Sequence, residues 1–404
     1  MQGELPSSSE LSDFRAWVNI TKSSVGLTIL MLPRAIGKVG IVPGTIGMGV
    51  LCMANLWGLI LVAKCRAIVE NGGNSESAPL RDAELAASAK KLPEPIWDSG
   101  YGYLDKLVAA GLGKRAQLLS VLSFVALELT DGIDFTQAIA EGLPRAFPDL
   151  QRNGILLGTG IVFMLLSFTN RLHNAAIIAV LALLTYFGIL ACLVFQGINH
   201  HHTTQVTLEM WRTTGYDYGS FFASANFVFT SLPVADRAYR EMQNKSRFVY
   251  VATAGYVTSW MFALFVALVG YYGYGTAAEE LIYLNFTGSA GVICTVGATV
   301  VICVSFVVLE VPLFMFLQAR LPGVHYMVVN SCAVWFQVFI AHMLPDINTC
   351  MSTLGTTAAI IACWMLPGLT FLSLSHRYAI GERLLTIAVM LLGVVGGVAA
   401  LASV

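Results

Sequence analysis

Eleven long apolar segments constrain the fold of this chain more than any other feature. A helix needs about 20 mostly apolar residues to cross the hydrocarbon core of a bilayer. Backbone groups in lipid must be paired within their own segment, which favours helices, and the weak alternation typical of a membrane barrel is absent. We therefore predict an all-α polytopic membrane protein with eleven transmembrane helices. The segments are 15–37, 41–66, 116–139, 153–169, 173–197, 220–243, 248–274, 290–317, 326–344, 351–374 and 381–403.

Composition and charge agree with this interpretation. Hydrophobic residues make up 56% of the chain and charged residues only 12%, about half the charged share of a soluble domain. The net charge of −1 provides no basic excess for binding nucleic acid. Residues 1–14 lack the basic start, apolar core and cleavage site of a signal peptide. We expect them to form a short tail before a single membrane domain, 15–404.

The Lys and Arg residues predict the orientation of the chain in the membrane. Sixteen of them fall on one side of the predicted spans and five on the other. The richer side is expected to be cytoplasmic, which places the N-terminus inside and the C-terminus outside. Asn285 then lies in an external loop, and its Asn-Phe-Thr sequence makes it a glycosylation candidate. Residues 81–91 resemble a short amphipathic helix at the inner surface.

The cysteine and histidine residues indicate neither a disulfide framework nor a metal site. Nearly all eight cysteines lie in apolar segments, where they act as small hydrophobic side chains, and only Cys350 is predicted near an exposed loop. His200, His201 and His202 fall in a predicted external loop. Three adjacent histidines do not share one helical face, which favours a solvated loop over metal ligation. We expect no metal and no cofactor.

The first apolar segment carries a cluster of polar residues that lipid does not tolerate. Asn19, Thr21, Lys22, Ser23 and Ser24 precede Gly26, and a central Lys alone costs roughly 3 kcal/mol on insertion scales. We predict a helix break near Ser24–Gly26 and a new half-helix from about Leu27. Its free amide groups would suit a carboxylate. The alternative is a continuous helix whose small residues allow close packing.

The sixth segment contains Pro233, which removes a backbone donor and disturbs a continuous helix. Carbonyl groups near Phe229 and Thr230 would then be free to accept hydrogen bonds from an ammonium group. A simple proline kink is the alternative. The two interruptions lie five segments apart, as expected for a five-plus-five inverted repeat. Repeat one would span about 15–197 and repeat two about 220–374, with 381–403 as an extra helix.

Several motifs resemble the amino acid/auxin permease family. The stretch from Lys22 through Gly26 to Ala35 is similar to that family's first-helix signature and looks most like its proton-coupled and vacuolar members. Glu241–Phe248, Gly270–Gly275, Pro312-Leu313 and Leu366–Leu369 are similar to its later motifs. This chain departs from the family pattern at Leu27 and Thr28, which replace small residues, and it lacks the frequent acidic-Gly pair of helix six.

The resemblance implies a leucine-transporter-like fold and amino acid transport by alternating access, often with protons. The substrate-binding candidates are Ser24, Gly26, Leu27, Thr28, Asn226, Phe229 and Thr230. In this fold sodium sites lie beside the first break. The ammonium group of Lys22 would stand in for the cation there, which favours sodium independence.

Ionisable residues inside apolar segments are functional candidates by default. Glu310 lies deep in the eighth segment, where a low dielectric favours the neutral acid, and it is the leading proton-carrier candidate; a Glu bonded to a neighbouring helix is the alternative. Glu128, Asp131 and Asp134 follow at intervals of three. We expect Glu128 to face a cavity and the two Asp residues to form an external vestibule. Lys22, Glu128 and Glu310 are the coupling candidates.

The leading function is secondary active transport of amino acids, proton-coupled and sodium-independent, in the plasma membrane or a vacuolar or lysosomal membrane. The alternatives are a sodium-coupled transporter and an amino acid sensor with little flux. No enzyme signature or pore loop appears, which argues against an enzyme or a channel. The expected partners are amino acid substrate, protons and membrane lipid, with no nucleic acid.

Overall fold

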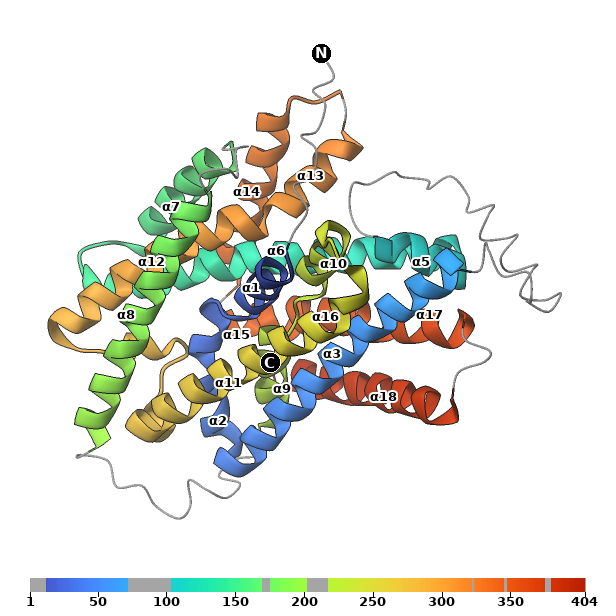
Figure 1. Cartoon of the computed structure of the whole chain (residues 1–404). Coiled ribbons are helices and arrows are strands. Elements are labelled where there is room, and N and C mark those ends of the chain that lie inside the picture. Colours follow the sequence, from blue (N-terminus) through green and yellow to red (C-terminus); the bar gives the residue numbers. More distant parts are fainter. Residues whose placement is uncertain are drawn as a thin grey trace.

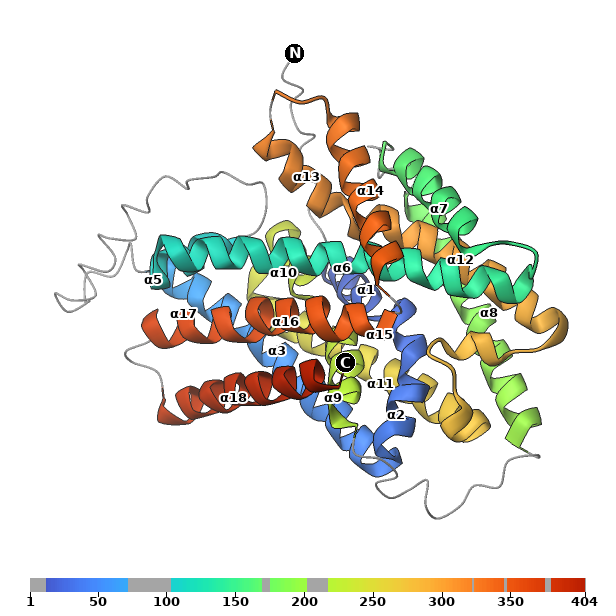
Figure 2. The same cartoon turned by 180° about the vertical axis from the view of Figure 1, so that it is seen from behind.

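The computed structural model describes residues 12–71, 103–168, 175–201, 217–321, 323–344, 347–374 and 379–403. These residues form helices joined by short connections (Figures 1 and 2). The predicted surface helix at 81–91 and His202 lie outside the described residues.

The first half of the chain provides the elements up to α8. They are α1 (Asp13–Ser24), η1 (Leu27–Met31), α2 (Leu32–Val39), α3 (Ile41–Asn71), α5 (Tyr103–Leu112), α6 (Lys114–Ala146), α7 (Arg152–Ser167) and α8 (Ala175–His201).

The second half begins with another interrupted helix. Its elements are α9 (Tyr218–Val228), α10 (Leu232–Glu241), η4 (Lys245–Arg247), α11 (Phe248–Tyr274), η5 (Gly275–Ala277), η6 (Ile282–Asn285), α12 (Gly288–Leu309), α13 (Val311–Arg320), α14 (Tyr326–Met343), α15 (Ile347–Cys350), η7 (Met351–Gly355), α16 (Thr356–Ala359), η8 (Ile360–Met365), α17 (Leu366–Leu374) and α18 (Ile380–Ala402).

Within the described residues, six helical stretches are long and apolar enough to cross a membrane. Others fall short because they are interrupted, as in α1–α2 and α9–α10, or because the apolar helix is too short, as in Arg152–Ser167. The six are Ile41–Val69, Lys245–Ala277, Gly288–Val307, Tyr326–Met343, Met351–Leu374 and Ile380–Ala402. The side chains of Met53, Leu184, Ile293, Leu391 and Val398 are well exposed, as expected where a helix faces lipid.

The helices pack into two groups. In the first, α1 lies against α10 and α11, α2 lies against α9 and α11, and α3 crosses α9 and α11. In the second, α6 packs against α7, α12 and α14, and α7 packs against α14. Figure 2 shows α6 running alongside α16 and α17, with α18 beyond them.

Several details differ from the expectations of the sequence. Helix α5 was not predicted, and α8 extends through His201, so that His200 and His201 belong to its end rather than to a loop. Segment 290–317 is divided at Glu310 into α12 and α13, since Pro312 lies in the first turn of α13 and cannot supply a helical N–H. Cys350 is fully buried rather than near an exposed surface.

Candidate functional site

The first interrupted helix ends at Ser24, and a 3₁₀ turn begins at Leu27. The Val25 N–H closes α1 by donating to the Thr21 carbonyl at 2.9 Å, and the Ile29 N–H donates to the Gly26 carbonyl at 3.3 Å. The amide groups of Gly26, Leu27 and Thr28 therefore have no helical acceptor in the described residues. Free N–H groups at the start of a helix form a natural anion site.

The side chains around the first break leave open space beside Gly26. Gly26 has no neighbouring atom within 4 Å of the position that a Cβ would occupy. The Ser24 side chain is buried, and its hydroxyl has no hydrogen-bond partner among the described residues. Leu27 is buried and Thr28 is partly exposed. The substrate candidates of the first segment thus surround one set of unpaired backbone donors.

The second interrupted helix ends at Val228 and resumes at Leu232. The Phe229 and Thr230 N–H groups donate to the Asn226 and Phe227 carbonyls, each at 3.1 Å, and the Ser231 N–H donates to the Phe229 carbonyl at 3.0 Å. The predicted free carbonyl of Phe229 is thus already occupied, whereas that of Thr230 accepts no hydrogen bond in the described residues. Pro233 lies in the first turn of α10 rather than in the gap, at a position where its missing N–H costs nothing.

The two breaks lie next to each other, because η1 packs against α9 while α1 packs against α10. Asn226, however, is turned into the helix packing. Its Oδ1 accepts a hydrogen bond from Asn55 Nδ2 of α3 at 2.9 Å, and Asn55 Oδ1 accepts one from Trp364 Nε1 of η8 at 3.1 Å. Asn226 is fully buried, and its Oδ1 joins α9 to α3, while its Nδ2 has no partner among the described residues.

The acidic candidates form a separate cluster. Glu128 and Asp131 of α6 lie within electrostatic range of Glu310 at the α12–α13 junction. Glu310 Oε2 accepts a hydrogen bond from Gln337 Nε2 of α14 at 2.8 Å. Asp134 is buried, with 2% of its surface exposed, so the expectation of an external vestibule is wrong for this residue. Lys22 makes no ion pair among the described residues.

Two small cavities lie near η1 and α2, each with room for about one water molecule. Both are far smaller than an amino acid. The apolar one lies between η1, α8 and α12, and the hydroxyl groups of Tyr186 and Ser305 are the only polar groups among the side chains that line it. Its lining residues are Leu27, Leu30, Tyr186, Ile189, Ala298, Val301, Ile302 and Ser305. The other is lined by Met31, Arg34, Ala35, Lys38, Ser224 and Glu280.

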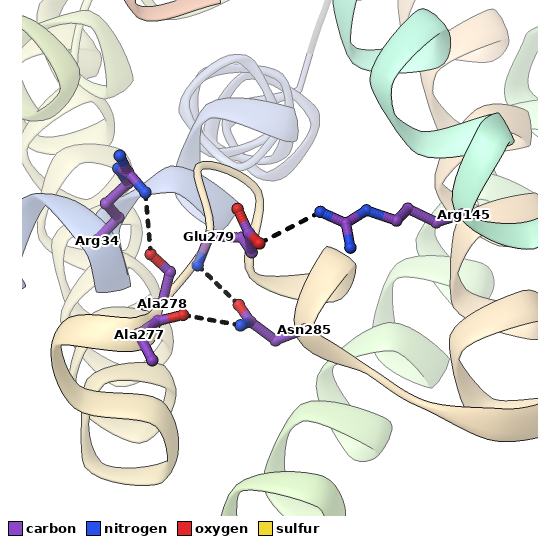
Figure 3. A network of polar contacts seen from close by, with 6 residues as sticks. All are labelled: Arg34, Arg145, Ala277, Ala278, Glu279 and Asn285. Atoms are coloured by element: carbon purple, nitrogen blue, oxygen red, sulfur yellow. Dashed lines mark hydrogen bonds and ion pairs between the residues drawn. The ribbon is translucent and has the colours of Figure 1, made fainter.

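The 275–286 segment, which follows α11, connects the two helix groups (Figure 3). Arg34 of α2 donates to the Ala278 carbonyl at 3.3 Å, and Arg145 of α6 lies 3.2 Å from Glu279. Asn285 holds the segment in shape: its Oδ1 accepts from the Glu279 N–H at 2.8 Å, and its Nδ2 donates to the Ala277 carbonyl at 2.9 Å. The amide proposed as a glycosylation acceptor is therefore also a structural group.

A further ion pair lies at the end of α2. Lys38 Nζ is 3.2 Å from the carboxylate of Asp217, which caps α9 by accepting from the Ser220 N–H at 3.0 Å. Partial burial acts to raise the pKa of Asp217, but the bonds from Ser220 and the Lys38 ammonium outweigh it and lower that pKa. The pair joins the two half-helices that follow and precede the breaks.

Asn285→Ala should lower the thermal unfolding midpoint of the purified protein, because the 275–286 segment loses two hydrogen bonds worth about 1 kcal/mol each. Thr287→Ala is the matched control. It also abolishes the Asn-Phe-Thr sequence, but the Thr287 side chain makes no capping hydrogen bond to α12. Gel mobility reports any glycan. Equal unfolding midpoints for both variants would show that the Asn285 amide has no structural role.

Sequence reasoning missed Asn55, Arg66, Asp236 and Gln337. Arg66 of α3 and Asp236 of α10 form a buried ion pair at 2.9 Å, and Gln337 holds Glu310. Arg66 and Asp236 lie towards the ends of their segments, and Asn55 and Gln337 are polar residues inside apolar segments. The sequence shows that these polar residues lie in or near apolar segments. It does not show which residue each of them contacts in the folded protein.

The fold is that of a multi-helix membrane transporter with paired interrupted helices. The family model of transmembrane amino acid transporter proteins matches residues 9–404. The chain therefore belongs to this family, and it is a transporter rather than an enzyme.

Named relatives agree with this assignment. The chain is 24% identical over 391 residues to vacuolar amino acid transporter 5 of Schizosaccharomyces pombe, covering 91% of this chain and 85% of that protein. It is 27% identical over 212 residues to amino acid transporter AVT1J of Arabidopsis thaliana, covering 50% of this chain and 49% of that protein.

Solved structures of Mhp1 share the fold. An inward-facing conformation aligns with a TM-score of 0.53 at 11% identity, covering 99% of this chain and 92% of Mhp1. A closed conformation of Mhp1, described as a nucleobase-cation-symport-1 family transporter with bromovinylhydantoin bound, gives 0.54 at 10% identity, covering 99% and 94%. At these identities the likeness concerns the fold alone.

Proposed function

We propose that this protein moves amino acids across a membrane by alternating access, coupled to protons and independent of sodium. The observation that carries the proposal is the set of unpaired amide groups at Gly26, Leu27 and Thr28, next to a second interrupted helix. The amides and the positive end of the half-helix bind the substrate carboxylate, and the Thr230 carbonyl accepts from the substrate ammonium.

The proposed architecture has eleven spans in two inverted repeats. Repeat one comprises the helices from α1 to α8, and repeat two those from α9 to α17, with α18 as the additional span. The positions of the two breaks, in the first span of each repeat, support this arrangement, and so does the likeness to Mhp1. Alternating access then consists of movement of the α1–α3 and α9–α11 group against the group built on α6, α7, α12 and α14.

Sodium independence is supported by the chemistry beside the first break. Hard cations in proteins are held by several oxygen ligands, but only two hydroxyl groups line the apolar cavity between η1, α8 and α12. Lys22 lies four residues before Gly26 without an ion-pair partner in the described residues. Its ammonium group supplies a fixed positive charge close to the break.

Proton coupling is supported by Glu310 and Glu128, two buried carboxyl groups in one helix group. Ionisable residues at such depth are rare in membrane proteins and mark proton or substrate paths. We place the protein in a vacuolar membrane, with its N-terminus on the cytoplasmic side, because its relative in fission yeast bears a vacuolar name and because Lys and Arg are concentrated on that side.

The test is uptake of the twenty labelled amino acids by proteoliposomes containing the purified protein, with an imposed pH gradient, with and without sodium. We expect uptake of at least one amino acid, several-fold faster with the gradient and unaffected by sodium. Protein-free liposomes are the control. Uptake that required sodium and ignored the pH gradient would refute the coupling, and binding without flux would favour a sensor.

A further inference from the structure

The junction between α12 and α13 contains a carboxyl group with an incomplete set of hydrogen bonds. Glu310 is fully buried, and its backbone continues the helix by donating to Phe306 at 3.0 Å and accepting from Phe314 at 3.1 Å. Its Oε2 accepts from Gln337 Nε2 at 2.8 Å, and the Gly132 N–H of α6 lies near the carboxyl group, but no hydrogen bond of good geometry reaches Oε1 among the described residues. A buried polar atom without a partner is costly and needs an explanation.

The amide group of Gln337, which faces Glu310, lacks a hydrogen-bond donor for its oxygen. Gln337 is 1% exposed, and its Oε1 likewise has no donor among the described residues. An ionised carboxylate only accepts hydrogen bonds, so it cannot satisfy an amide oxygen. A neutral carboxylic acid can, because its O–H donates to the amide oxygen while the amide N–H donates to the acid. If the Gln337 amide were rotated by 180°, its Oε1 and Nε2 would change places. One amide oxygen would still face the carboxyl group, so Glu310 would still have to carry a proton.

The surroundings hold this amide in place and offer no cation. A Cβ on Gly132 of α6 would collide with the amide of Gln337, so the absence of a side chain at Gly132 makes room for the pair. The charged groups that face Glu310 are Glu128 and Asp131, both acidic. No Lys, Arg or His among the described residues forms an ion pair with Glu310. A proton is the group that completes the hydrogen bonds of both side chains.

We propose that Glu310 carries the coupled proton and that Gln337 is its positioning residue. In the conformation that the structure describes, the neutral acid and the amide form two hydrogen bonds that tie the α12–α13 junction to α14. When the proton leaves Glu310 for water, one of these bonds is lost and the junction is released. The inference rests on the proposed proton coupling and adds the residue that recognises the protonated form.

The test measures proteoliposome uptake of the best amino acid from the panel above, as a function of pH. Glu310→Gln replaces the acid by a permanently neutral amide that keeps two bonds to Gln337, so exchange of labelled for unlabelled amino acid should persist while the response to pH disappears. Gln337→Leu should move the pH midpoint of uptake away from the wild-type value, because the neutral and the ionised form of Glu310 lose different hydrogen bonds to this amide.

The matched control is Gln318→Leu. Gln318 of α13 donates to Asn330 of α14 at 2.8 Å, so this variant removes another amide bond between the same two helices without touching the acid. It should leave the pH midpoint unchanged. A wild-type pH response in Glu310→Gln would overturn the role of Glu310. Equal midpoints for Gln337→Leu and Gln318→Leu would overturn that of Gln337.

Infrared difference spectroscopy tests the same inference without transport. Wild-type protein should show the carbonyl band of a protonated carboxyl group, lost in Glu310→Gln and shifted in Gln337→Leu. Absence of that band in wild type, or its survival in Glu310→Gln, would exclude Glu310 as the proton site even if uptake proves to be proton-coupled. Presence of the band with pH-indifferent uptake would instead refute the proposed coupling.

Discussion

Gly26→Leu should abolish amino acid uptake while leaving the protein as stable as the wild type. Gly26 adopts φ −141° and ψ −157°, an extended conformation open to any residue. A Cβ there meets nothing within 4 Å, so the first carbon of the new side chain causes no clash, and the rest of the side chain is expected to crowd the adjoining amides of Leu27 and Thr28. Loss of two charge-assisted hydrogen bonds, each worth about 1.5–3 kcal/mol, weakens carboxylate binding by at least about 100-fold.

Gly58→Ala is the contrasting variant. A Cβ at Gly58 of α3 would collide with the Cys363 carbonyl of η8, which is backbone and cannot move aside without shifting the helix. We expect a lower yield and a lower unfolding temperature for Gly58→Ala, although Ala adds a smaller side chain than the Leu of Gly26→Leu. Uptake and thermal unfolding of both purified variants decide the matter. A stability loss in Gly26→Leu as large as that in Gly58→Ala would contradict free space at the first break.

Arg66→Met should destabilise the folded protein by about 3–5 kcal/mol, because it removes the cation 2.9 Å from a buried carboxylate. Arg66 and Asp236 are 2.9 Å apart, with side chains 3% and 6% exposed. The Arg66 guanidinium also lies 4.3 Å from the centroid of the Tyr239 ring. This cation–π contact adds to the interaction between α3 and α10. The measurement is the unfolding midpoint of the purified protein in detergent.

Two variants separate the buried charge from other effects. Arg66→Met combined with Asp236→Leu removes both charges and should recover much of the stability, since a buried pair can be replaced by apolar side chains. Arg247→Met breaks the exposed pair with Asp13, whose side chains are 67% and 36% exposed, and should cost less than about 1 kcal/mol. Equal losses in Arg66→Met and Arg247→Met would show that burial does not govern the pair.

Predictions from the sequence were most accurate for features that depend on one residue or one segment alone, such as a membrane helix or a helix break. Apolar segments identify helices because lipid requires local backbone pairing, and the polar cluster from Asn19 to Gly26 lies where α1 ends and η1 begins. Helix α5 was missed because a helix of 10 residues shows too few turns for its apolar pattern to be distinctive. Pro233 indicated an interruption nearby, but the gap lies just before it, at 229–231.

The candidate site was less predictable because its contacts join distant parts of the chain. The hydrogen bond between Asn226 and Asn55, 171 positions away, was not foreseen when Asn226 was proposed to line the break. Asp134 was expected near the surface, but α6 is covered by α12 and α14 at its flanks, and this residue is buried. The periodicity of α6 gives the direction of a side chain around the helix but not what covers it.

The sequence by itself determined that this chain is a helical membrane protein with an interrupted first helix, because both properties follow from the local cost of polar groups in lipid. It also carried the motifs that resemble the amino acid/auxin permease family. Only the tertiary structure decided which polar groups meet: Glu310 with Gln337 beside Gly132, and Arg66 with Asp236. These pairs depend on the packing of whole helices against one another, and no local rule of charge or periodicity encodes that choice.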